Sequence, residues 1–111
     1  MTYPMVQQRY LCSHVATLTV GDAAWPVLIE EIGPLGAILE CEEEIPAAAF
    51  AQLECGGPFF AGVLSKAAAH EFGWRSEIAF DPQTPWSPEI FRPSHLLDLQ
   101  QMKGPKKDSV D

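Results

Sequence analysis

Ile29–Glu40 reads IEEIGPLGAILE, and this stretch decides the fold because two apolar segments meet in it at a Gly-Pro-Leu-Gly sequence. Pro34 suits the second position of a β-turn, since its ring holds φ near the value that this position requires. Gly33 and Gly36 leave the backbone free to bend on either side of the turn. The stretch therefore predicts a β-hairpin.

Further segments typical of strands lie on both sides of this hairpin. They alternate apolar with polar residues or are rich in apolar residues, and turn sequences separate them, as at Gly21-Asp22 and Gly56-Gly57-Pro58. Six short strands at this spacing predict an all-β fold, namely a six-stranded antiparallel barrel. The six expected strands span residues 13–20, 24–32, 37–42, 50–55, 59–65 and 74–80.

The pattern changes after Asp81, where four prolines within a dozen residues are incompatible with a regular strand. Ser94 suits the N-cap of a short C-terminal helix over residues 95–102, which Gly104-Pro105 would end. Trp86 is expected to lie in the core and to anchor this segment on the barrel. The sequence thus predicts an extended lead over residues 1–8, a barrel with a helical segment over 9–102, and a disordered tail over 103–111.

The length and the net charge of the chain limit the classes of function that it can have. A chain of 111 residues has room for one small domain. Its net charge of −8 disfavours nucleic acid and anionic membrane surfaces as partners. No apolar run is long enough to span a membrane and no export signal is visible, so the cytoplasm is the expected location. The three cysteines are expected to be reduced and buried.

The strand order, the hairpin and Gly36 resemble the PilZ domain, a small bacterial barrel best known as a cyclic di-GMP receptor. The hairpin of that family carries Asp/Asn-x-Ser-x-x-Gly, and the same spacing here reads Glu31-x-Gly33-x-x-Gly36. The family also has Arg-x-x-x-Arg before its first strand; Arg9 matches the second arginine, while Met5 stands at the first. The resemblance implies that Arg9, Glu31, Gly33 and Gly36 occupy the ligand site.

These departures from the family's motif remove much of its chemistry. Two guanidiniums suit a dinucleotide because each planar fork binds phosphate or guanine bidentately. Each lost charge-assisted contact costs about 1.5–3 kcal/mol, so three departures predict binding weaker by about 10³-fold or more. The expected function is a bacterial signalling or regulatory module, not an enzyme and without a cofactor, that binds cyclic di-GMP weakly or acts through a protein partner.

Two other functions stay open. One is a protein-interaction barrel with no ligand, for which the acidic residues Glu40 and 42–44 could form a surface for a basic partner or simply a solvated loop. The other, less favoured, is a small metal-dependent enzyme. The histidines and Cys12 follow no zinc-binding spacing, and no catalytic motif is visible, so no catalytic residue or metal ligand is assigned.

Overall fold

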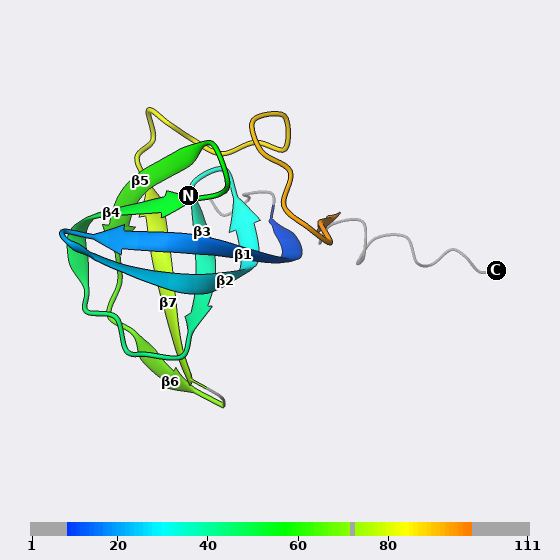
Figure 1. Ribbon diagram of the computed structural model, residues 1–111. Coiled ribbons are helices and arrows are strands. Elements are labelled where there is room, and N and C mark those ends of the chain that lie inside the picture. Colours follow the sequence, from blue (N-terminus) through cyan, green and yellow to red (C-terminus); the bar gives the residue numbers. More distant parts are fainter. Residues whose placement is uncertain (1–8, 72, 99–111) are drawn as a thin grey trace, which may run out of the picture.

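The computed structural model describes residues 9–71 and 73–98, and these form an all-β structure around a closed barrel (Figure 1). The barrel order is β1-β2-β3-β7-β5-β4, with β4 returning to β1, and all neighbours are antiparallel. Two short strands, β6 and β8, pair with β7 and β1 from outside this ring. The strands are β1 Tyr10–Val20, β2 Ala23–Gly33, β3 Gly36–Cys41, β4 Ala48–Glu54, β5 Phe59–Leu64, β6 Ala68–His70, β7 Gly73–Phe80 and β8 Leu97–Asp98.

The expected six-stranded antiparallel barrel is therefore confirmed, and so is the hairpin from which it was predicted. Pro34 and Leu35 form a two-residue turn between β2 and β3, and Gly33 pairs with Gly36 directly across it. The second predicted turn, between β4 and β5, places Gly56 at a φ of +83°, which L-residues with side chains rarely adopt. Within the described residues there is no helix, and so none that could cross a membrane.

A β-bulge in β2 sets which side chains face outward near the hairpin. Ile29 pairs with Leu39 and Glu31 with Ile38, so Glu30 is the extra residue between them. Ile29 and Ile32 are both buried, while the two glutamates between them point away from the core. The bulge thus places two neighbouring carboxylates on the outer face of one strand.

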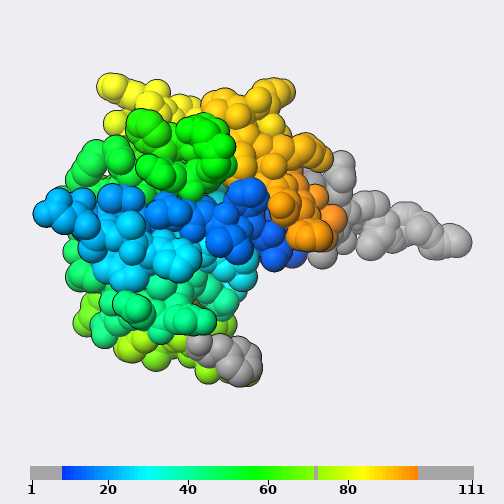
Figure 2. All heavy atoms as spheres, in the orientation of Figure 1, coloured from blue at the N-terminus to red at the C-terminus, as the bar shows by residue number. Residues whose placement is uncertain are grey.

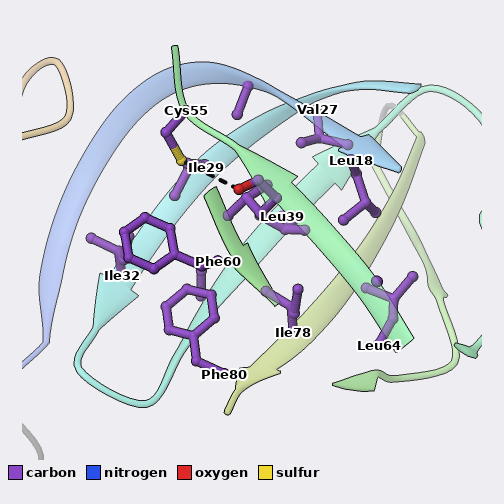
Figure 3. Packing of buried hydrophobic residues seen from close by; sticks show 14 of the residues in the cluster. Leu18, Val27, Ile29, Ile32, Leu39, Cys55, Phe60, Leu64, Ile78 and Phe80 are labelled. Carbon is purple, nitrogen blue, oxygen red and sulfur yellow. Dashed lines mark hydrogen bonds between the residues drawn. The ribbon is translucent and has the colours of Figure 1, made fainter. Parts of the chain in front are cut away.

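The core lies inside the barrel and receives side chains from every one of its six strands (Figure 3). The rings of Phe60 and Phe80 lie side by side with centroids 5.3 Å apart. Along β7 the predicted alternation holds, because Ser76, Ile78 and Phe80 are buried and the residues between them are exposed. The largest fully buried side chains are Trp86, Leu18, Ile29, Ile32, Leu39, Ile45, Leu53, Leu64 and Ile78.

The expected C-terminal helix is wrong over residues 95–98, where it can be tested. Instead, β8 pairs with Tyr10–Leu11 of β1, and the Ser13 N–H donates to the Ser94 carbonyl at 3.0 Å. The first residues of β1 lie beyond its pairing with β4, so this edge needs hydrogen-bond partners and the C-terminal segment supplies them (Figure 2). Residues 99–102 of the expected helix, the lead 1–8 and the tail 103–111 lie outside the described residues.

The C-terminal segment is nevertheless anchored as predicted. Trp86 is buried in the core cluster, and its backbone N–H donates to the carbonyl of Pro34 in the hairpin turn at 3.1 Å. Phe91 and Leu96 pack against the same cluster, whereas Leu97 is exposed. The segment after β7 is thus part of the barrel's closure.

Candidate functional site

The arginine expected to bind an anion is paired with carboxylates. Arg9 directly precedes β1, and its Nη1 lies 2.8 Å from Oε1 of Glu31 on β2. Its Nη2 lies 3.7 Å from Oε2 of Glu77 on β7. A phosphate that approached this guanidinium would meet two carboxylates already beside it, which disfavours an anion here.

The two glycines of the expected site lie opposite each other at the hairpin turn. Gly33 is buried and pairs with Gly36 across the turn. A Cβ at Gly36 would lie 2.6 Å from the carbonyl oxygen of Ile78, which is closer than real Cβ contacts, so glycine lets β3 approach β7 here. The glycine that matches the family's motif therefore has a structural role that needs no ligand.

A shallow cavity of about 310 Å³ lies beside Arg9. Among the residues that line it, Arg9 carries the only positive charge and Glu77 the only negative charge. The Ser65 hydroxyl accepts a hydrogen bond from the Glu77 N–H at 3.0 Å, so this polar group is already used within the protein. The structure thus brings Arg9, Glu31 and Gly36 together, but into a site with little free positive charge. The lining residues are Arg9, Leu35, Gly36, Val63, Ser65, Glu77, Ile78 and Ala79.

A second cavity, of about 340 Å³, opens where β2 and β3 separate. Their pairing stops at Leu28 and Glu40, while β3 continues along β7 to a pair between Cys41 and Trp74. Two indoles and three carboxylates line the space that this divergence leaves. The lining residues are Val15, Trp25, Pro26, Val27, Leu28, Glu40, Cys41, Glu42, Glu43, Gly73 and Trp74.

The indole of Trp25 is held in place at this cavity. Its Nε1–H donates to Oε1 of Glu43 at 3.2 Å, which joins the wall contributed by β2 to the loop after β3. Both Trp25 and Trp74 are half-buried, so part of each side chain remains open to solvent. None of the lining residues is Lys, Arg or His, and the cavity is therefore negatively charged.

Next to this cavity, four charged or titratable side chains form a network across β2, β3, β6 and β7. His70 Nε2 lies 2.9 Å from Glu40 Oε2. Arg75 Nη2 lies 2.9 Å from Glu30 Oε1, 3.8 Å from Glu40 Oε2 and 3.3 Å from His70 Nε2. Burial raises the pKa of Glu30 above its ordinary value, and the hydrogen bond and negative charge of Glu40 raise it further, against the lowering effect of Arg75.

Three members of this network have the chemistry of metal ligands. One ligand atom each from Glu30, Glu40 and His70 lies within 4.8 Å of the others. One nitrogen and two carboxylate oxygens are a donor set that zinc accepts. The guanidinium of Arg75, however, already lies within hydrogen-bond or ion-pair distance of all three groups. The arrangement is accordingly a satisfied ion-pair network, which orients Glu40 at the edge of the second cavity.

The cysteines are free thiols, as expected from the sequence, though only Cys55 is fully buried. Burial raises the pKa of Cys12 to about 11, and the negative charge of Glu31 adds to this effect. Burial likewise raises the pKa of Cys55 to about 12. Neither thiol has the lowered pKa that nucleophilic cysteines require.

Comparison of the chain with protein-family models, with curated proteins and with solved structures finds no match. The two cavities and their charges are therefore the features of this chain that bear on its function.

Sequence reasoning did not find the second cavity. The acidic residues after β3 were noted as a possible surface for a basic partner, but no local pattern joined them to Trp25 or Trp74. One local signal was available: the spacing of Ile29 and Ile32 breaks the alternation of β2 and marks the bulge that turns Glu30 outward. The approach of β7 to β3, which brings Trp74 to the cavity, has no such local signal.

Proposed function

We propose that this barrel is a regulatory module that binds a protein with a basic surface, and that cyclic di-GMP is at most a weak ligand. One observation carries the proposal: Arg9, the cation expected to hold phosphates, is paired with Glu31 at 2.8 Å, and Glu77 lies near its other nitrogen. A dinucleotide that used Arg9 would have to bring its phosphates beside these two carboxylates.

The resemblance to PilZ domains is part of this proposal. The hairpin, Gly36 and an antiparallel barrel agree with that family, while Met5, Glu31 and Gly33 depart from its binding motif. A PilZ-like barrel that keeps the fold without the ligand chemistry would act through protein contacts. The alternative, an interaction barrel that binds no nucleotide at all, differs from it only in the outcome of a nucleotide titration.

The charge distribution favours a basic partner. Glu42, Glu43 and Glu44 are all exposed in the loop after β3, and Glu40 lies at the edge of the cavity beside them. The chain as a whole carries a net charge of −8. Complementary charge speeds association and disfavours partners of the same sign, which suits a module that must find one basic protein.

Titration calorimetry with cyclic di-GMP tests the proposal that this nucleotide is at most a weak ligand. We expect a dissociation constant no tighter than the high micromolar range, and a value below about 1 μM would overturn it. If weak binding is measured, Arg9→Ala should abolish it. The control is Arg92→Ala, since Arg92 is an exposed arginine that does not line the cavity beside Arg9.

Fluorescence anisotropy with a labelled peptide of alternating lysine and glycine tests the proposed binding of a basic partner. We expect binding that weakens between about 20 and 200 mM salt and falls several-fold in the double variant Glu42→Gln/Glu43→Gln. The control Glu54→Gln/Glu89→Gln removes the same charge at exposed positions away from the second cavity. Absence of binding, or an equal loss in the control, would refute the proposal of a basic partner at this surface.

A further inference from the structure

The second cavity is lined by aromatic rings and by carboxylates, and together these groups favour the binding of an organic cation. Trp25 and Trp74 contribute indoles, and the indole is the aromatic side chain that attracts cations best. Glu40, Glu42 and Glu43 contribute carboxylates to the same lining. We propose that this cavity binds one lysine or arginine side chain of the basic partner; the inference rests on the proposed function and names its recognition site.

Of the three carboxylates, Glu42 and Glu43 are available to such a cation. Glu40 already faces His70 at 2.9 Å and Arg75 at 3.8 Å. Glu43 accepts the Trp25 N–H through one of its oxygens, which leaves its charge uncompensated by any ion pair described in the structure. A cation entering the cavity would therefore meet negative charge that no ion pair among the described residues neutralises.

The size and the remaining lining match a single long side chain. A volume of about 340 Å³ is at the lower end of the range for ligand pockets. Val15, Pro26 and Leu28 add apolar surface, on which the methylene stem of lysine or arginine can pack while its head meets the indoles and carboxylates. An anion such as a nucleotide would be repelled by the same lining.

The cavity is also built before any ligand arrives. The Trp25–Glu43 hydrogen bond holds one wall, and backbone pairing of Trp74 with Cys41 on one side and Ala69 on the other holds the opposite wall. Walls held by strand pairing and a hydrogen bond need little ordering when a side chain enters, so less affinity is lost to conformational entropy.

Three tryptophans make this inference directly measurable. In ¹H–¹⁵N NMR spectra each indole N–H gives its own signal, and the Trp86 indole is buried and donates to the Phe91 carbonyl, so it serves as an internal control. We expect Nα-acetyl-lysine methylamide, which keeps its charged side chain, and its arginine counterpart to shift the Trp25 and Trp74 signals in a saturable way. The Trp86 signal should stay unchanged. The norleucine counterpart, which has a similar stem and no charge, should shift the Trp25 and Trp74 signals far less.

Variants then test the two chemistries separately. Trp74→Leu and Glu43→Gln should each weaken binding of the lysine analogue, by about tenfold for the indole and several-fold for the carboxylate. Glu54→Gln is the matched control, and thermal melts show that each variant is folded. Equal binding of the norleucine analogue, no saturable shift of either indole, or unchanged affinity in folded Trp74→Leu would overturn the inference.

The outcomes also separate this inference from the proposed function. If the lysine–glycine peptide binds through Glu42 and Glu43 but leaves the Trp25 and Trp74 signals in place, the inference fails and the basic partner stands. If the lysine analogue binds in the cavity but the peptide does not bind at all, the cavity is a cation site and the proposal of a basic protein partner is refuted.

Discussion

Replacing Trp86 by alanine should come close to unfolding the barrel. The side chain is only 1% exposed and lies in the core cluster, although it belongs to the irregular segment after β7. Its ring meets the ring of Tyr10 edge to face with centroids 5.4 Å apart, and its Nε1–H donates to the carbonyl of Phe91 at 2.8 Å. Trp86→Ala removes the ring and leaves that carbonyl without its partner.

The size of the effect follows from these contacts. Truncation of a buried tryptophan or phenylalanine to alanine typically costs about 3–5 kcal/mol. The unpaired carbonyl adds about 1 kcal/mol, while the whole domain has only about 5–15 kcal/mol of stability. At a urea m-value of about 1–2 kcal/mol/M, a loss of about 4 kcal/mol lowers the unfolding midpoint by about 2–4 M.

Urea unfolding followed by far-ultraviolet circular dichroism measures this loss without relying on tryptophan fluorescence. Ile90→Ala is the matched control, because Ile90 lies in the same segment but is exposed and should change stability by about 0.5 kcal/mol at most. Trp86→Phe keeps most of the ring and loses the hydrogen bond, so it should lie between the two. If Trp86→Ala unfolds at the same urea concentration as the unmodified protein, the segment after β7 does not close the core.

Three further predictions concern other parts of the barrel. Gly36→Ala should lower the free energy of unfolding by about 1–3 kcal/mol, because the new Cβ would crowd a backbone carbonyl of β7; an unchanged melting temperature would contradict that close approach. Because the folded state raises the pKa of Glu30 above the reference value of 4.5, protonated Glu30 favours the fold below that pH, and this contribution is lost as the pH rises through the folded pKa. Melting temperatures measured across this range should therefore depend less on pH in Glu30→Gln than in the parent protein. At pH 8 iodoacetamide should alkylate Cys41, which lines the second cavity, before Cys12 and Cys55, because burial raises the pKa of these two thiols to about 11 and about 12. Mass spectrometry measures the three rates, and equal rates would argue against the burial of Cys12 and Cys55.

Local sequence determined the turns and the strands from which the barrel is built. The turn at Pro34, the alternation along residues 74–80 and the glycines between β4 and β5 each predict their structure within a few neighbouring residues, and the structure confirms all three. Turn chemistry and the two-residue period of a strand are short-range effects, so a single sequence carries them. The hairpin motif and the position of Arg9 also led to residues that do lie together, namely Arg9, Glu31 and Gly36.

Only the tertiary structure decided which partners these residues contact. The helix expected after Ser94 does not form over residues 95–98, because the start of β1 offers hydrogen bonds to β8. Arg9 is paired with Glu31, and Glu77, from a strand far along the chain, lies near its other nitrogen. The second cavity likewise needs Trp74 of β7 beside Trp25 of β2, an arrangement that depends on how β3 pairs with both strands. Partners chosen by pairing between distant strands leave no local pattern in the sequence, since the register is set by packing of the whole barrel.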